Sequence, residues 1–212
     1  MLKFGFEWEV FVFDSQSGWP ILAAEHGYSH DGNNLLGEIR TVGGQALRDA
    51  IFDLKKNADI FYHRLKPIHF VPEEAVNSIK TTAELKQYMR RLGSHKDPVI
   101  VQNLYGRKPR NSSAFLASFQ INISNVLRES YKFKKQVIPA VYGLLDIPTI
   151  VRNFDKAFER HIKESNRQPG MYALKDLDTR LEYRSLPSSV FHEYRDKPFE
   201  LESIIQSCVE SR

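Results

Sequence analysis

Apolar and polar residues alternate in four segments of the chain, a pattern typical of strands whose two faces differ. In the N-terminal segment, about residues 3–13, one face is entirely apolar: Leu2, Phe4, Phe6, Trp8, Val10 and Val12. The other face carries Lys3, Gly5, Glu7, Glu9, Phe11 and Phe13. Glu7 and Glu9 therefore stand side by side, about 6.5–7 Å apart at Cα. Like charges this close repel unless solvent, a cation or a metal separates them.

Three later segments repeat this division between an apolar and a polar face. The polar sets are Glu38 with Arg40 in LLGEIRT, Gln120 with Asn122 in AFLASFQINIS, and Arg180, Glu182 and Arg184 in TRLEYRSL. A solvated sheet face also alternates, usually with Lys, Thr and Ser mixed in. Each segment alone favours that interpretation. Together, the acid pairs, the two amides and an acid between two arginines favour a functional site.

The remaining segments predict helices that cover the apolar face. Apolar residues at three- and four-residue spacing predict helices over 47–65 and 148–165, and a further helix is predicted at the C-terminal end, from 198. Shorter helices are expected over 81–93 and 136–145, and short strands over 67–71 and 98–105. The whole is typical of one α+β domain spanning residues 1–212, with helices on an apolar sheet face and a polar face left for chemistry.

Composition narrows the class of protein. With 42% hydrophobic and 26% charged residues, the chain is expected to fold around a sizeable core. A net charge of +4 is compatible with a polyanion such as ATP, and nucleic acid is not a favoured partner. One cysteine, Cys208, excludes an intramolecular disulfide. The chain has no apolar run of about 18 residues, and acids interrupt its N-terminal apolar stretch. We therefore expect no membrane association and a cytoplasmic location.

The residue types on the polar face suit phosphoryl transfer. Magnesium prefers oxygen ligands, commonly a few carboxylates together with phosphate oxygens. Arginine presents a planar fork that matches phosphate or carboxylate oxygens. Glu7, Glu9, Glu38 and Glu182 are candidate metal ligands, and Arg180 and Arg184 would place cations around the same phosphate.

The motifs FGFEWEV, HDGNNLLGEIRT, SFQINIS and RLEYRSLPSS, in this order, resemble those of carboxylate-amine ligases in the glutamine synthetase and glutamate-cysteine ligase superfamily. The similarity is greatest to the compact phage-type members. The resemblance implies a glutamine-synthetase-like, mostly antiparallel curved sheet with the active site on its polar face. It also implies an ATP- and Mg2+-dependent enzyme, with Mn2+ as an alternative ion.

The resemblance also implies roles for individual residues. Glu7, Glu9, Glu38 and Glu182 would be metal ligands, and Glu7, Glu9, Arg40 and Arg184 would be catalytic. Arg167, Arg180, Arg184, Gln120 and Asn122 would bind the nucleotide. Asp31-Gly32, and Arg167 with Gly170 and Tyr172, also match the family pattern. Arg40 would hold either a substrate carboxylate or a phosphate, and the sequence does not choose between them.

One position departs from the pattern of many family members. They carry H-x-H where this chain has Gln120 and Asn122, although some glutamate-cysteine ligases have Q-x-N there. Amides replace an imidazole metal ligand poorly, so one metal site is expected to be weaker or missing. The implied reaction forms an acyl phosphate from ATP and a carboxylate, which an amine then converts to an amide. Both substrates and the oligomeric state stay open.

Two other functions remain alternatives. Clustered acids and arginines also occur in metal-dependent nucleases and phosphatases. A catalytically inactive relative that binds a nucleotide or a protein would explain the amides. His26 and His30 are weaker candidates for a metal, because histidines in loops are more often simply solvated.

Overall fold

Seven antiparallel strands form one sheet in the computed structural model, which describes residues 2–14, 36–64, 68–71, 101–108, 117–124, 130–133, 136–139, 146–165, 167–175 and 180–210. The strands are β1 (Lys3–Asp14), β2 (Leu36–Arg40), β3 (Ile68–Val71), β4 (Val101–Asn103), β5 (Ser118–Ser124), β8 (Met171–Lys175) and β9 (Arg180–Pro187). Their order is β2-β1-β5-β9-β8-β4, and β3 pairs with the far end of β1. The predicted α+β class is confirmed.

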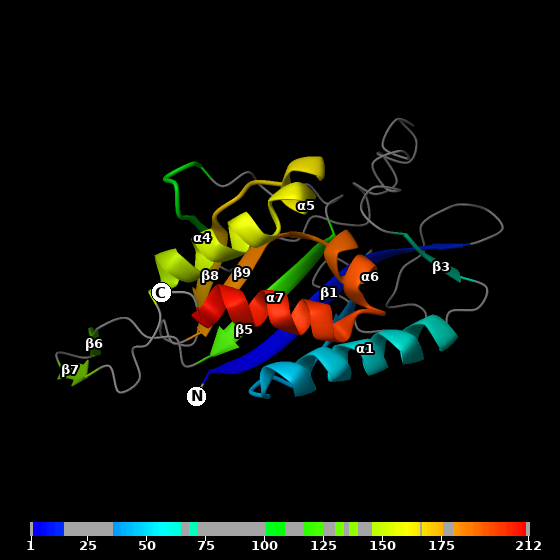
Figure 1. Cartoon of the computed structure of the whole chain (residues 1–212), viewed down its shortest axis with the longest axis horizontal. Helices are drawn as coiled ribbons and strands as arrows, with labels where there is room; N and C mark the ends of the chain where they lie inside the picture. Colours follow the sequence, from blue (N-terminus) through cyan, green and yellow to red (C-terminus); the bar gives the residue numbers. More distant parts are fainter. Residues whose placement is uncertain are drawn as a thin grey trace.

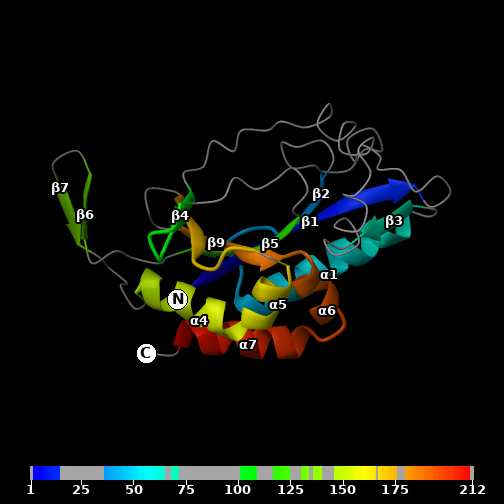
Figure 2. The same ribbon diagram turned by 90° about the horizontal axis from the view of Figure 1, so that it is seen from above.

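Helices cover one face of this sheet, as the two views in Figures 1 and 2 show. They are α1 (Leu47–Arg64), α4 (Ile147–Ala157), α5 (Glu159–Glu164), α6 (Ser189–Tyr194) and α7 (Pro198–Glu210). The apolar sides of β1, β5 and β9 form the core with them, because alternate residues of each strand are buried there. None of the helices in the described ranges has the length and apolar character needed to cross a membrane.

Trp8 joins strand β1 to the helical layer. Its indole is buried and lies edge-to-face with the ring of Phe191, with centroids 5.0 Å apart. The indole N–H donates a hydrogen bond to the main-chain carbonyl of Ser188 at 2.9 Å. This satisfies the one polar atom of a buried tryptophan side chain. The residue between the two N-terminal acids is therefore a core anchor.

Most of the predicted elements are present, and three predictions were wrong or incomplete. The helix expected over 136–145 is wrong at its start, because Gln136–Pro139 forms strand β7 against β6 (Ser130–Phe133). β-Branched residues in this segment favour the extended form once a partner strand is available. The helix expected over 148–165 breaks at Phe158, and neither β8 nor α6 was predicted. The helix expected over 81–93 lies outside the described residues.

A buried aspartate on α4 ties the helices to the sheet. Asp155 Oδ1 accepts hydrogen bonds from the Tyr183 hydroxyl at 2.7 Å and the Gly170 amide at 2.9 Å, and Oδ2 accepts one from the Tyr105 hydroxyl at 2.8 Å. Burial, together with Asp155, raises the pKa of Tyr105 to about 12 and that of Tyr183 well above its usual 10.0. Both hydroxyls therefore stay protonated as donors at neutral pH.

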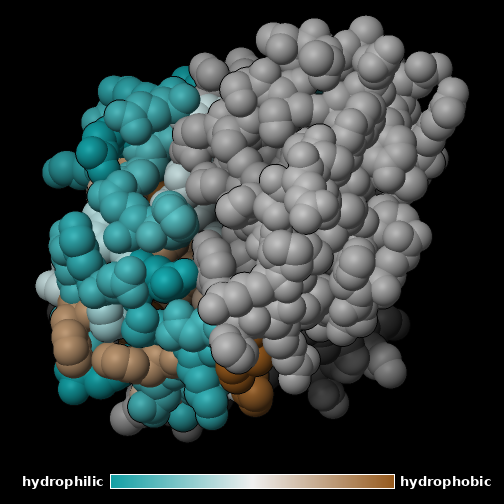
Figure 3. Space-filling model, turned by 90° about the vertical axis from the view of Figure 1, so that its right-hand side faces the viewer, coloured by the Kyte–Doolittle hydropathy of each residue, from teal (hydrophilic) through white to brown (hydrophobic). Residues whose placement is uncertain are grey.

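The outer side of the helical layer is mainly solvated. Ion pairs join its helices across the surface, such as Arg48 with Glu202 at 3.0 Å and Lys55 with Asp196 at 3.1 Å. In the side view of Figure 3 the described surface is mostly hydrophilic, with small apolar areas. Exposed ion pairs of this kind contribute little to stability.

Replacing Gly170 with alanine should destabilise the fold strongly. Gly170 has φ +78°, and an added Cβ would lie 2.7 and 2.8 Å from two ring carbons of Tyr105. Gly44, at φ +83° with no neighbouring atom within 4 Å, is the matched control. We expect Gly44→Ala to cost about 1–2 kcal/mol of backbone strain alone and Gly170→Ala clearly more, measured by urea unfolding. Equal losses would contradict the close packing at Gly170.

Candidate functional site

The described strand register gathers the predicted site residues on the sheet face opposite the helices, called the polar face below. Glu7 on β1 lies directly opposite Arg40 on β2 and Gln120 on β5. Asn122 lies between Gly5 on β1 and Glu182 on β9. The members of the polar face are Glu7, Glu9, Glu38, Arg40, Gln120, Asn122, Arg180, Glu182 and Arg184, together with Ser118 and Lys175. These residues come from five adjacent strands, β2, β1, β5, β9 and β8.

Glu9 is a buried carboxylate held by neutral donors. Its Oε2 accepts hydrogen bonds from the Ser118 amide at 3.0 Å and the Ser118 hydroxyl at 2.6 Å. Its Oε1 accepts one from the Gln120 side-chain amide at 2.9 Å. Hydrogen bonds to the ionised form favour the negative charge of a carboxylate. Glu9 is therefore well satisfied by the protein itself, which distinguishes it from Glu7.

Two further carboxylates are paired with cations. Buried Glu38 forms an ion pair with Arg40, whose guanidinium also donates to Oε2 at 2.6 Å and is 58% exposed. Glu182, with 0% exposure, forms ion pairs with both Lys175 on β8 and Arg184 on its own strand. A carboxylate buried this deeply requires such compensation. Arg40 and Arg184 each present a guanidinium on the polar face while neutralising a neighbouring acid.

The two amides of β5 connect the acids to the cations. Asn122 accepts a hydrogen bond from Arg180 Nη1 at 2.8 Å and places its own Nδ2 3.5 Å from Glu7 Oε1. Gln120 is 3% exposed, and its Oε1 has no hydrogen-bond partner within the described part of the chain. An orphaned buried acceptor is costly and calls for a donor or a metal.

Arg167, predicted to bind the nucleotide, contacts the main chain of the sheet. Its Nη2 donates to the Ala117 carbonyl at 2.7 Å and its Nη1 to the Arg184 carbonyl at 3.2 Å. Between these points the register of β5 with β9 shifts, since Ile121 faces Tyr183 while Phe119 faces Leu186. Arg184 and Ser185 thus share the place opposite one residue, as in a β-bulge. Nucleotide binding by Arg167 stays a prediction.

Sequence reasoning missed two participants. Lys175 was missed because β8 was not predicted, although Met171, Ala173 and Lys175 alternate with Tyr172 and Leu174 in MYALK. Ser118 was missed because the polar set of β5 was drawn from Gln120 and Asn122 alone. Its place two residues before Gln120, on the same side of the strand, was the available signal.

The donors of the polar face suit magnesium, although they do not form a closed cage. Within the described ranges no three acidic, histidine or cysteine side chains converge on one point. Magnesium commonly takes only one or two protein carboxylates, with phosphate and water completing its coordination. Glu7 fits this: burial, then Glu182 and Glu38, raises its pKa above the usual 4.5. A cation beside Glu7, with Gln120 Oε1 as a second oxygen ligand, would offset the negative charge around Glu7 and would give the buried Gln120 oxygen a partner.

Comparison of the chain with protein-family models, curated proteins and solved structures found no match.

Glu7→Gln should stabilise the protein at neutral and alkaline pH. Because the folded-state pKa of Glu7 is raised, its contribution to stability is present below pH 4.5 and is lost as pH rises through the raised value. We expect a higher Tm for the variant at about pH 8 and no gain at about pH 4, since each kcal/mol shifts Tm by roughly 2–4 °C. Thermal unfolding between about pH 4 and pH 8 measures the difference in Tm between the variant and the original protein. A lower Tm of the variant at about pH 8 would contradict the raised pKa of Glu7.

Glu9→Gln, the same substitution on the same strand face, should have the opposite effect. The new amide NH2 replaces one of the two acceptor oxygens, so it would face either the Ser118 donors on Oε2 or the Gln120 donor on Oε1. Leaving buried donors unpaired costs about 1–3 kcal/mol each. Urea unfolding at neutral pH should show this loss. Equal effects of the two substitutions would mean that the acids are equivalent, against the hydrogen bonds described above.

Proposed function

We propose that the chain is an ATP- and magnesium-dependent carboxylate-amine ligase with a glutamine-synthetase-like fold. The observation that carries the proposal is the gathering of acids, amides and arginines from four segments on one polar face of an antiparallel sheet. The order of these segments matches the motifs that resemble the ligase family. The departure at Gln120 and Asn122 leaves the donor set rich in oxygen, which favours magnesium over softer metals.

Each residue then has a role in a two-step reaction. In the first step a carboxylate oxygen of the substrate attacks the γ-phosphorus of ATP, and ADP leaves. In the second an amine attacks the acyl carbon, phosphate leaves, and the nitrogen loses a proton. Arg184 and Arg180 would neutralise charge on the transferring phosphoryl group, and Arg40 would hold the substrate carboxylate or a phosphate. Because phosphoryl transfer depends mainly on positioning and charge, no covalent step by the protein is needed.

Glu7 is the carboxylate best placed to hold magnesium. It lies between Arg40 and Gln120 in the register, and burial, followed by the negative charges of Glu182 and Glu38, raises its pKa. Glu38 and Glu182 would join it by giving up part of their ion pairs with Arg40 and Arg184 as phosphate approaches. A magnesium ion held by these carboxylates would supply positive charge for the transferring phosphoryl group. Glu9, held by Ser118 and Gln120, would orient the neighbouring amide.

Trapping of an acyl phosphate tests the proposal directly. The protein is incubated with ATP, Mg2+, an equimolar mixture of the proteinogenic amino acids and hydroxylamine as the amine. We expect one molecule of hydroxamate to form for each molecule of ADP released. Arg184→Lys should lower the rate by roughly 10²-fold, because Lys lacks the bidentate fork. Arg152→Lys, on the exposed side of α4, is the matched control and should leave the rate unchanged.

Other outcomes would support the alternatives. Cleavage of bis(p-nitrophenyl) phosphate with no hydroxamate would favour a metal-dependent phosphodiesterase. No calorimetric binding of Mg-ATP, together with no cleavage of bis(p-nitrophenyl) phosphate, would contradict both enzymes and would favour an inactive relative. ADP release without hydroxamate would contradict transfer to a carboxylate.

A further inference from the structure

The turn that follows β4 presents an aromatic ring and two cations next to one another. Tyr105, Arg107 and Lys108 are all exposed, and Tyr105 is 46% exposed. The turn lies at an edge of the sheet, because β4 follows β8 as the last strand (Figure 2). The surrounding sequence is also poor in negative charge, since no acid occurs between Asp97 and Glu129. The three turn residues do not belong to the polar face, so they form a separate feature of the surface.

Hydrogen bonds hold this turn in one conformation. The side-chain oxygen of Asn103 accepts hydrogen bonds from the main-chain amides of Tyr105 at 3.0 Å and Arg107 at 3.3 Å. The main-chain amide of Leu104 donates to the carbonyl of Gly170, the residue before β8, at 2.9 Å. A ligand that binds here therefore needs to order little of the backbone, which favours binding.

The Tyr105 ring is fixed at its hydroxyl and open on the side of Arg107. Its hydroxyl donates to Asp155 at 2.8 Å, and the ring packs so closely on Gly170 that a Cβ there would lie 2.7 Å from a ring carbon. On the other side, Arg107 Cζ lies 6.0 Å from the ring centroid. A planar ligand between the two groups needs about 7 Å, that is, two contacts of about 3.5 Å. The exposed Arg107 side chain would provide this space by moving about 1 Å.

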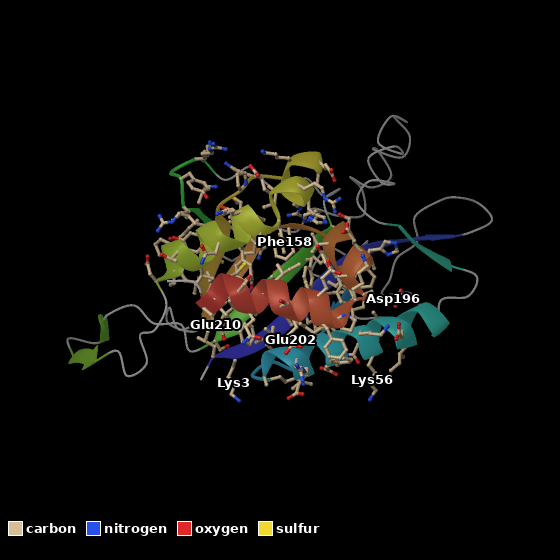
Figure 4. All side chains as sticks on the ribbon, viewed as in Figure 1. Lys3, Lys56, Phe158, Asp196, Glu202 and Glu210 are labelled. Carbon is tan, nitrogen blue, oxygen red and sulfur yellow. The ribbon has the colours of Figure 1, made fainter. Side chains whose placement is uncertain are left out.

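A second exposed pair of arginine and aromatic ring shows what distinguishes the turn. Arg48 Cζ lies 5.7 Å from the ring centroid of Phe199, which is 62% exposed. In that pair Glu202, labelled beside α7 in Figure 4, forms an ion pair with the Arg48 guanidinium at 3.0 Å. Within the described ranges, neither Arg107 nor Lys108 forms an ion pair with a carboxylate. Their positive charge is therefore available to a ligand.

An aromatic ring beside two cations suits a ligand that is planar at one end and anionic at the other. Nucleobases stack on tyrosine rings and on the guanidinium planes of arginine. Arginine and lysine also bind phosphate oxygens through charge-assisted hydrogen bonds. Proteins that bind single strands use several successive aromatic rings, whereas this turn offers one ring and two cations. The set therefore fits one base and one phosphate group.

We propose that Tyr105, Arg107 and Lys108 form a binding site for a single nucleoside monophosphate. The base lies between the Tyr105 ring and the Arg107 guanidinium, and the phosphate group lies at Lys108. The site needs no metal ion. It is separate from the polar face, and it does not depend on the ligase proposal.

Titration of AMP with the protein in excess EDTA, followed by NMR, tests the site. We expect saturable binding with a Kd of about 1 mM, as suits one stacked base and one bound phosphate. The adenine H2 and H8 signals should shift upfield, because they enter the ring current of Tyr105. Adenosine lacks the phosphate and ribose 5-phosphate lacks the base, so each should bind roughly tenfold more weakly.

Variants of the turn assign the binding to its residues. Tyr105→Leu and Arg107→Gln should each raise the Kd of AMP roughly tenfold, through loss of the stack or of the cation. Tyr105→Phe retains the ring and should bind AMP almost as tightly as the original protein. Arg48→Gln is the matched control, because it removes an arginine beside another exposed ring, and it should leave Kd unchanged. Circular dichroism checks that each variant is folded. If Tyr105→Leu does not fold, Arg107→Gln still decides the question.

Four results would overturn the proposal. They are no saturable binding of AMP, an equal loss of affinity in Arg48→Gln, and tighter binding of a single-stranded deoxythymidine oligonucleotide than of AMP. The fourth is a loss of AMP binding in Arg184→Lys but not in Tyr105→Leu, which would place the nucleotide on the polar face. Hydroxamate formation without AMP binding would retain the ligase and reject this site, and AMP binding at the turn without hydroxamate formation would do the reverse.

Discussion

Charge compensation across the polar face is the constraint on which the candidate site depends. Four carboxylates and several cations lie on neighbouring strands, and Glu9, Glu38 and Glu182 are buried. Burying such charges is tolerable only when each is paired or hydrogen-bonded. The protein meets this demand unevenly: Glu9, Glu38 and Glu182 have close partners, while among the described residues Glu7 receives only a 3.5 Å contact from Asn122 and has a raised pKa. The incompletely compensated group is the one best suited to a ligand.

Strand β5 holds the charged residues of the polar face in position. Its apolar side, including Phe119 and Ile121, packs into the core, while its polar side separates the acids from the cations. The bulge opposite Gln120 brings Arg184 and Ser185 to one place, and Arg167 fixes the backbone on both sides of it. Arginine suits this task because its fork reaches two carbonyls at once. The helical layer also helps to position strand β9, because Asp155 on α4 accepts a hydrogen bond from the Tyr183 hydroxyl.

Strand periodicity was sufficient to predict which residues of each strand share the polar face, because a period of two leaves no other arrangement once one face is buried. It predicted the polar sets of β1, β2, β5 and β9 and the main helices. It did not predict β8, whose short segment has a weak pattern, or the break at Phe158. Pairings such as Glu9 with Ser118 could not be predicted either, since they depend on strand order and register. The helix expected over 136–145 shows how a partner strand overrides local preference.

The amides at positions 120 and 122 gain a physical explanation from their surroundings. A histidine in place of Gln120 could donate to Glu9 through one ring nitrogen, but it would offer an imidazole nitrogen in place of the amide oxygen that now stands unpaired. Asn122 donates toward Glu7 and accepts from Arg180 at the same time. A neutral imidazole also has one donor and one acceptor, but it is bulkier than the asparagine amide. The amides thus link an acidic to a basic region while adding no charge to either. Neutrality at the boundary preserves the separation of charge along the sheet face.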